Sequence, residues 1–176
     1  TNFSDFSFQA AHSTQVQNQE KCGQRRLPGD QPGQENVGLF ASINAGGTVR
    51  NVGLSKVQVT GPGNVGGLAG QNQGKVQNVH IDGQVNGTEG GTNVGGLIGL
   101  NSGVIQETYA TADVSSSGAA GGLVGADQGG SINDSYASGQ VQGRDGIGGL
   151  VGRTDSDTLI EQTYASGLVQ LAPSAA

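Results

Sequence analysis

The sequence predicts an all-β fold, a parallel β-solenoid (β-helix) of about five coils with about 27 residues per coil. The first reason is an internal repeat of the tripeptide Gly-Gly-Leu, which ends at Leu68, Leu97, Leu123 and Leu150, in steps of 29, 26 and 27 residues. The second is an alternation of small apolar and polar residues within each unit. The third is composition: with 34 glycines, no tryptophan and no methionine, the chain disfavours helices and allows only a thin aliphatic core.

The first half of each unit reads Val-Gly-Gly-Leu-x-Gly and is expected to be a short strand bounded by glycines. Turns such as Asn72-Gln73-Gly74 and Asn101-Ser102-Gly103 follow it. Gly and Asn tolerate left-handed backbone dihedrals, so they let the chain turn sharply between short strands. The segment Val37-Gly38-Leu39-Phe40 gives a degenerate fifth copy, in which Phe40, 28 residues before Leu68, is expected to take the leucine position.

The second half of each unit alternates with a period of two, which is typical of a half-buried strand. The face predicted to point inward carries Val79, Ile81, Gly83 and Val85, then Thr108, Ala110, Ala112 and Val114, then Ser135, Ala137, Gly139 and Val141. The face predicted to point outward carries His80, Asp82 and Gln84, then Tyr109, Thr111 and Asp113, then Tyr136, Ser138 and Gln140. Corresponding strands should pair in parallel, so that equivalent residues form ladders. We expect Val79, Ala110, Ala137 and Ala165 to align inside one wall.

The repeat pattern divides the chain into three segments. Residues 36–170 hold the solenoid repeats. Residues 1–35 depart from the repeat, with Phe3, Phe6 and Phe8 alternating before a Gln-rich stretch, and form either an N-terminal strand or cap or a loosely ordered extension. Residues 171–176 are expected to be a tail or the truncation point of a longer array, because they contain no polar cap for the unpaired backbone of a solenoid end. Further solenoid repeats are therefore expected in the full-length chain.

Charge and composition exclude several classes of partner. The net charge is −6 and the isoelectric point about 4.6, which disfavours nucleic acid and anionic lipid. No apolar run approaches the roughly 18 residues of a membrane span, so membrane insertion is not expected. Cys22 is the single cysteine, which leaves no intramolecular disulfide and no thiolate cage for a metal.

One repeat position carries His80, Tyr109, Tyr136 and Tyr164, and a second position beside it carries Thr111, Ser138 and Ser166 together with Asp82. Both rows are predicted to point outward, with rings about 4.8 Å apart, the spacing of paired strands. Tyrosine has an apolar ring and a polar tip, so this aromatic and hydroxyl surface is a candidate for contact with glycan or protein. The alternative is that the ladder only stacks and stiffens the face of the coil.

The sequence favours neither a metal site nor a catalytic site. The acidic turn residues Asp127, Asp134, Asp145, Asp155 and Asp157 lie in different turns and match no calcium-binding loop, so solvated surface charge is expected there. His12 and His80 belong to no zinc motif, and no Gly-x-Ser-x-Gly turn is present. Asp82 and Asp113 lie in consecutive coils but at non-equivalent positions, which disfavours paired-carboxylate glycosidase chemistry. We expect a non-enzymatic protein without a cofactor.

The pattern Val94-Gly95-Gly96-Leu97-Ile98-Gly99 with Asn101, Gly103 and Ile105, followed by Tyr109-Ala110-Thr111, resembles the GLUG repeat of bacterial surface and secreted proteins. The resemblance recurs at residues 121–141 and 148–169, and more loosely at 65–85. It implies a repeat module of large adhesin-like exoproteins of the filamentous-haemagglutinin type, which also occurs in some immunoglobulin A peptidases. The motif has no catalytic residues to carry over.

These observations predict a non-catalytic structural or adhesive module of a secreted or cell-surface bacterial protein. Its partner would be a glycan or a protein of a host or cell surface. The alternative is a spacer within a large secreted peptidase or other exoenzyme whose catalytic domain lies elsewhere. A third candidate is a binder of an ice or carbohydrate lattice, although the row of Thr111, Ser138 and Ser166 is not a uniform threonine array.

Overall fold

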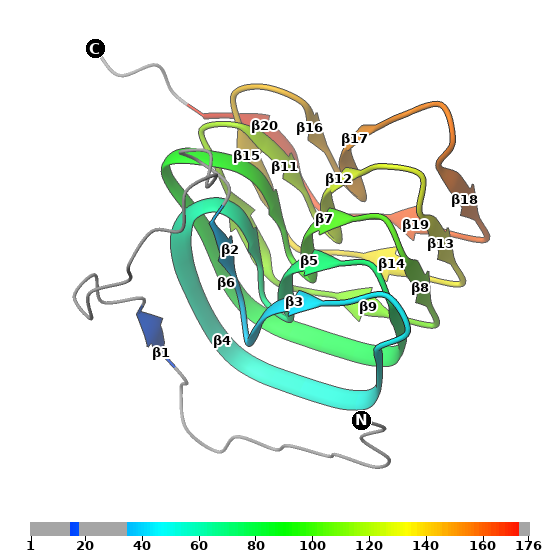
Figure 1. Ribbon diagram of the computed structural model, residues 1–176. Helices are drawn as coiled ribbons and strands as arrows, with labels where there is room; N and C mark the ends of the chain where they lie inside the picture. The colour runs from blue at the N-terminus through cyan, green and yellow to red at the C-terminus, as the bar shows by residue number, and fades with distance from the viewer. Residues whose placement is uncertain (1–14, 18–34, 173–176) are drawn as a thin grey trace, which may run out of the picture.

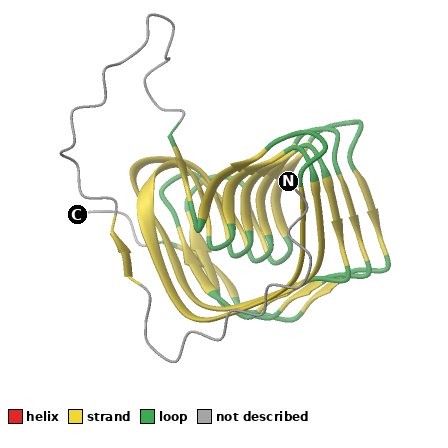
Figure 2. Ribbon diagram, turned by 60° about the horizontal axis from the view of Figure 1, so that its bottom comes forward, coloured by secondary structure: helices red, strands yellow, loops and turns green. Residues whose placement is uncertain are grey.

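The computed structural model describes residues 15–17 and 35–172, which form a stack of coils (Figure 1). The described residues contain strands, turns and bends but no helix. Strands of successive coils pair in parallel, and Figure 2 shows the coils following one another as nested loops. The predicted parallel β-solenoid, with about five turns of about 27 residues, is confirmed.

Each coil passes through five strand segments, which we call walls one to five in chain order. Wall one contains β2 (Asn36–Val37), β11 (Ala119–Gly121), β16 (Ile147–Gly148) and the ends of β4 (Thr48–Gly66) and β6 (Lys75–Gly95). Wall two contains β3 (Phe40–Ile43), β5 (Ala69–Asn72), β7 (Ile98–Asn101), β12 (Val124–Asp127) and β17 (Val151–Thr154). We number coils one to five by these wall-two strands.

The other three walls complete each coil. Wall three contains β8 (Val104–Gln106), β13 (Ser131–Asn133), β18 (Leu159–Glu161) and the first residues of β4 and β6. Wall four contains β9 (Tyr109–Ala110), β14 (Tyr136–Ala137), β19 (Tyr164–Ala165) and the middle of β4 and β6. Wall five contains β10 (Asp113–Ser115), β15 (Val141–Gly143), β20 (Val169–Leu171) and further residues of β4 and β6, and β1 (Gln15–Gln17) pairs with β4 beside it.

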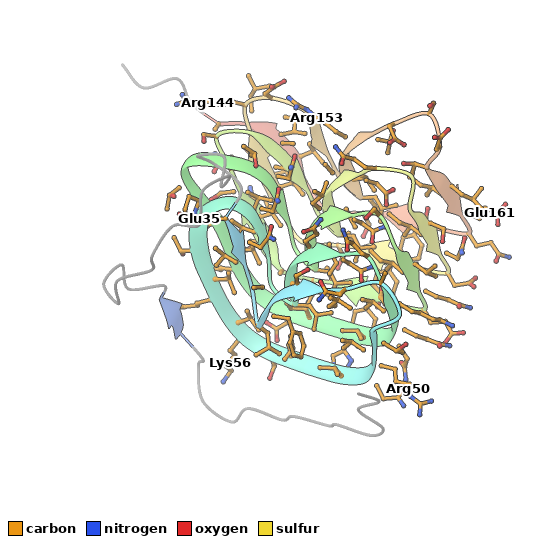
Figure 3. All side chains as sticks on the ribbon, in the orientation of Figure 1. Glu35, Arg50, Lys56, Arg144, Arg153 and Glu161 are labelled. Carbon is orange, nitrogen blue, oxygen red and sulfur yellow. The ribbon has the colours of Figure 1, made fainter. Side chains whose placement is uncertain are left out.

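The core is a set of apolar columns along the inside of the walls. Leu68, Leu97 and Leu123 of the Gly-Gly-Leu segments are completely buried, as are Ile105 and Ile132 of wall three. The predicted inward face of the second half-unit is confirmed, with Gly83 partly exposed and its other members buried in coils two to four. The labelled charged side chains in Figure 3, among them Arg50, Lys56 and Glu161, point away from the interior. Burial of small aliphatic side chains therefore holds the coils together.

Two expectations about register were wrong. Ala110, Ala137 and Ala165 do align in wall four, but the residue of coil two in that column is Ile81 rather than Val79. The pairing of His80 with Tyr109 fixes this register, because a slip that placed Val79 opposite Ala110 would take the two rings out of alignment.

The first Gly-Gly-Leu copy was also misaligned. Phe40 pairs with Ala69, one position beyond Leu68, because the segment 37–40 is one residue shorter than the segment 65–69. Phe40 and Leu39 are both exposed, so neither reproduces the buried leucine of the inner coils.

The glycines at the junction of walls one and two are required by close backbone approach. A Cβ atom on Gly96 would collide with the carbonyl oxygen of Gly122, and one on Gly122 would collide with that of Gly149. The coils are therefore in backbone contact at this corner, and the repeated Gly-Gly follows from the absence of space for a side chain.

The corner between walls three and four uses a left-handed residue in every coil. The residues are Asn51, Asn78, Glu107, Asp134 and Gln162, with φ between 49° and 57°. Few residues other than glycine adopt this conformation, and Asn and Asp do so most readily. In the first two coils the column is joined by a hydrogen bond of 2.7 Å from Asn78 Nδ2 to Asn51 Oδ1.

The expected N-terminal strand, cap or extension over residues 1–35 falls mostly outside the described residues, apart from β1 and Glu35. The strand expected around Phe3, Phe6 and Phe8 lies outside them as well, and so do residues 173–176 of the expected tail. The described solenoid strands run from β2 in coil one to β20 in coil five.

Candidate ligand-contact ladder

Wall four stacks the four aromatic residues that the sequence placed at one repeat position. The ring centroids of His80 and Tyr109 are 5.1 Å apart, and those of Tyr109 and Tyr136 and of Tyr136 and Tyr164 are each 4.9 Å apart. Neighbouring ring planes are within 10° of parallel. We call these four side chains the aromatic ladder. Its regular spacing follows from the in-register parallel pairing of the strands below it.

Stacking determines which surfaces of the aromatic ladder can reach a partner. Tyr109 and Tyr136 each have a neighbouring ring on both faces, so mainly their edges are open to contact. His80 lies over Gly53 of coil one, where an added Cβ would collide with the imidazole ring. Tyr164, in coil five, is 58% exposed. The ladder therefore offers a row of ring edges and phenol groups, and a wide ring face only at Tyr164.

The central tyrosine has a perturbed acidity. The pKa of Tyr136 lies above its ordinary value. The main cause is desolvation, and the negative charges that Tyr109 and Tyr164 would carry when ionised raise it further. A tyrosine phenol is a neutral hydrogen-bond donor and acceptor at physiological pH, and the upward shift keeps Tyr136 in that state to a higher pH.

The second predicted row also lies on the outside of wall four. Thr111, Ser138 and Ser166 are exposed, and backbone hydrogen bonds of 2.8–3.0 Å tie each to the coil before it. The hydroxyl of Thr111 also donates to the carbonyl oxygen of Ile81 at 3.3 Å. The structure thus brings all seven predicted contact residues onto one outer face, as an aromatic row beside a hydroxyl row.

A polar ladder inside the turn between walls two and three was not anticipated. Asn72 Nδ2 donates to Asn101 Oδ1 at 2.7 Å, and Asn101 Nδ2 donates to Asp127 Oδ2 at 2.6 Å. All three side chains are at most 1% exposed. Their common position before the turn glycines is the sequence signal that could have revealed this ladder.

One expectation for the acidic turn residues was wrong. Asp127 is buried rather than solvated, and its carboxylate also accepts hydrogen bonds from the backbone N–H of Gly130 at 2.8 Å and from the Thr158 hydroxyl at 3.0 Å. The position inside the turn explains its burial, because a carboxylate with these donors can replace the asparagine of the preceding coils. Asp134, Asp145, Asp155 and Asp157 are exposed, as expected.

Asp155 caps the same turn in coil five. Partial desolvation raises the pKa of its carboxyl, but hydrogen bonds from the backbone of Asp157 and Gly129 and from Thr158 outweigh this and lower the pKa below its ordinary value. Within the described residues, no group of three or more His, Cys, Asp or Glu side chains is placed to hold a metal ion. The absence of a calcium requirement stays a prediction.

The two carboxylates considered for glycosidase chemistry do not align. Asp113 pairs with Gln84, whereas Asp82 follows Ile81 in the wall-four column. Among the described residues, no helix has the length and hydropathy of a membrane span.

Comparison with known proteins identifies the repeat. Residues 116–142 match the family model described as the GLUG motif, and they run from the end of coil three through coil four to β15. These residues are a GLUG motif. One GLUG motif thus corresponds to about one turn of the solenoid, and it contains Gly121-Gly122-Leu123 in the core and Tyr136 in the aromatic ladder.

The chain is also similar to halomucin of the archaeon Haloquadratum walsbyi, with 40% identity over 58 residues. This match covers 33% of the chain and 1% of halomucin. No solved structure matches the chain. The GLUG motif and the solenoid together establish that the described chain is a repeat module, while the similarity to an archaeal protein does not single out a bacterial source.

Proposed function

We propose that the chain is a non-catalytic structural and adhesive repeat module of a secreted or cell-surface protein. The stacked coils would hold a binding surface away from the cell, and the outer side-chain ladders would contact glycan or protein. The observation that carries the proposal is the in-register aromatic ladder from His80 to Tyr164, with its row of hydroxyls, on the outside of a GLUG-containing solenoid. An exposed aromatic and hydroxyl surface suits contact with hydroxyl-rich or polar partners.

The comparisons support a location outside the cell. The GLUG resemblance implies a large exoprotein. Halomucin has a mucin-like name, and it is very large, because the 58 matched residues amount to only 1% of its length. The acidic charge of −6 disfavours nucleic acid as a partner.

Further solenoid repeats in the full-length protein are part of the proposal. Ile132 and Val141 of coil four are completely buried, whereas their partners Ile160 and Val169 of coil five are 38% and 40% exposed. A further coil stacked on this face would bury the apolar surface.

Attachment assays with the purified, labelled chain test the adhesive role. We expect binding to at least one polysaccharide or cell surface and a clear loss of that binding when Tyr136 and Tyr164 are both replaced by alanine. Gln128→Ala is a suitable control because Gln128 is exposed in a turn outside the ladder. Unchanged attachment of the double variant on every tested surface would remove the aromatic ladder from the function.

The alternative is that the module is a spacer within a large secreted peptidase or other exoenzyme. The separate catalytic domain that this alternative requires would be found in the full-length reading frame. A zinc motif downstream would favour the spacer, whereas a long repeat chain with an export partner would favour the adhesin.

A further inference from the structure

The outer face of wall five carries two rows of mostly polar side chains next to the aromatic ladder. The rows are Gln58, Gln84, Asp113, Gln140 and Leu168, and Thr60, Asn86, Ser115, Gln142 and Gln170. Between the rows lies a depression of about 210 Å³, which we call the wall-five depression. It is lined by Gln84, Asn86, Asp113, Val114, Ser115, Gln140 and Gln142.

The wall-five depression arises from side-chain length. In coil three the two rows hold the short Asp113 and Ser115, whereas coil four holds Gln140 and Gln142 on one side and coil two holds Gln84 and Asn86 on the other. The wall-five depression, or notch, is therefore one coil wide, and the backbone at the buried Val114 forms its floor. Parallel pairing on both sides fixes the backbone that frames the depression.

Much of the hydrogen-bonding capacity of the notch is unused. Asp113 Oδ1 accepts from the backbone N–H of Gln140 at 2.9 Å, which leaves Oδ2 open. The Ser115 hydroxyl donates to Asn86 Oδ1 at 2.8 Å, which fixes the amide of Asn86 with its NH₂ group available. Within the described part of the chain, the side-chain amides of Gln84, Gln140 and Gln142 have no hydrogen-bond partner.

The chemistry of these groups selects a neutral, hydroxyl-rich ligand. Amides supply both donors and acceptors, and a carboxylate accepts from hydroxyl groups. The lining includes no lysine or arginine, and Asp113 would repel a carboxylated or sulfated sugar in a chain that is already acidic. The volume is below the range typical for drug-sized ligands, so the notch suits one unit of a longer molecule.

We propose that the wall-five depression binds one sugar residue of a neutral polysaccharide, with Asp113 and the flanking amides as its hydrogen-bonding groups. This proposal rests on the glycan-binding form of the proposed function and adds a defined subsite beside the aromatic ladder. Neighbouring sugar residues would extend along or across the walls, where Thr111 and the phenol groups of wall four provide further polar contacts.

The test uses the purified chain and neutral oligosaccharides built from glucose, N-acetylglucosamine, mannose or galactose, with a glucuronate-containing oligosaccharide for comparison. Affinity is measured by calorimetry, and the binding site is located by NMR shifts of the Val114 and Ser115 amides. The main variant is Ser115→Gln, which fills the notch with the side chain already present in coil four. The matched control is Thr60→Gln, in the same row but outside the depression. Gln142→Ala, which removes a lining amide without adding bulk, is a second variant.

We expect one neutral oligosaccharide to shift the wall-five amides, and Ser115→Gln and Gln142→Ala to weaken its binding by about tenfold. Thr60→Gln should leave affinity within about twofold, and the glucuronate compound should bind more weakly than the neutral one. Binding that survives both depression variants but is lost in Tyr136→Ala would overturn the subsite and leave the adhesive function standing. So would attachment of the chain to cells or proteins without binding of any neutral oligosaccharide. Failure of the chain to bind any tested cell surface, protein or oligosaccharide would contradict both the adhesive function and the sugar subsite.

Discussion

Tyr109 and Tyr136 are 27 residues apart in the chain, yet their rings stack with centroids 4.9 Å apart and planes 2° from parallel. The contact depends on the direct pairing of the two tyrosines in adjacent parallel strands. Because all three tyrosines of the chain belong to the aromatic ladder and tryptophan is absent, tyrosine absorbance and fluorescence report on this surface alone.

Removal of the central ring should destabilise the solenoid. Tyr136→Ala eliminates two stacking contacts. One aromatic pair typically contributes about 0.5–1.5 kcal/mol, so we expect the free energy of unfolding to fall by about 2 kcal/mol. Tyr164→Ala removes one contact from a more exposed position and should cost about half as much. Urea unfolding followed by circular dichroism measures both. Equal losses in the two variants would show that stacking is not the source of the effect.

Stability should fall at high pH because of Tyr136. Its pKa is raised in the folded state, so the folded protein holds the phenol proton more tightly than the unfolded chain does. This contribution is complete below the unfolded pKa of about 10 and is lost as the pH rises through the folded value.

Ultraviolet titration of tyrosinate and urea unfolding at a series of alkaline pH values measure this linkage. In the wild type the last tyrosine should titrate above the ordinary range, and Tyr136→Phe should abolish that late step. Tyr164→Phe serves as the comparison, and a late step that persisted in Tyr136→Phe would contradict the assignment.

Backbone contact between coils should make Gly122 intolerant of a side chain. In Gly122→Ala the new methyl group would meet the carbonyl oxygen of Gly149 and lie 2.9 Å from the Cβ of Ala137, so we expect a loss of about 2–3 kcal/mol. Gly149→Ala occupies the same repeat position in coil five and, among the described residues, meets only the side chains of Ala165 and Val169, so it should cost less than about 1 kcal/mol. Thermal and urea unfolding compare them, and similar costs would refute the backbone-contact explanation.

The corner between walls three and four should accept a stabilising substitution. Glu107 has a φ of 53°, which asparagine adopts more readily than glutamate. Glu107→Asn should therefore raise the free energy of unfolding by about 0.5–1 kcal/mol, and its amide could extend the hydrogen bond between Asn78 and Asn51. Gln106→Asn, in the neighbouring strand position, should give no such gain. A loss of stability in Glu107→Asn would argue against backbone strain at this corner.

The buried polar ladder should depend on its carboxylate. Asp127→Ala leaves the N–H of Gly130 without its acceptor and the amide of Asn101 with only the carbonyl oxygen of Gly103, and we expect a loss of about 2–3 kcal/mol. Asp127→Asn should retain most of the stability because asparagine fills the equivalent position in coils two and three. The exposed Asp157→Ala should change stability by less than about 0.5 kcal/mol. If Asp127→Asn were as damaging as Asp127→Ala, the ladder interpretation would fail.

Much of the architecture could be read from local patterns. The recurrence of Gly-Gly-Leu predicted the coils, and the alternation around Tyr109 and Tyr136 predicted which side chains point outward, because a strand places successive residues on opposite faces. Register was less accessible. The shorter segment before Phe40 changes the pairing of coil one by one residue, and no local pattern distinguishes that shift from a substitution.

For the candidate site as well, the sequence predicted one part and only the structure showed the rest. The sequence identified the aromatic ladder because identical residue types recur at one repeat position. It did not predict that stacking would cover the faces of the inner rings, since that depends on side-chain orientation across coils. The wall-five depression was equally hidden, because it results from the contrast between the short Ser115 and the long Gln142, which pair with each other in adjacent coils.

By itself, the sequence determined that this protein is a stack of short strands with a thin aliphatic core and a polar exterior, because periodicity and glycine content act locally and repeat in every coil. Tertiary structure alone decided which atoms of successive coils meet: Ile81 beneath Ala110, Asp127 inside a turn, and a notch between glutamines. These contacts join residues nearly thirty positions apart, and their geometry is set by the register of parallel pairing, which no single unit of the sequence contains.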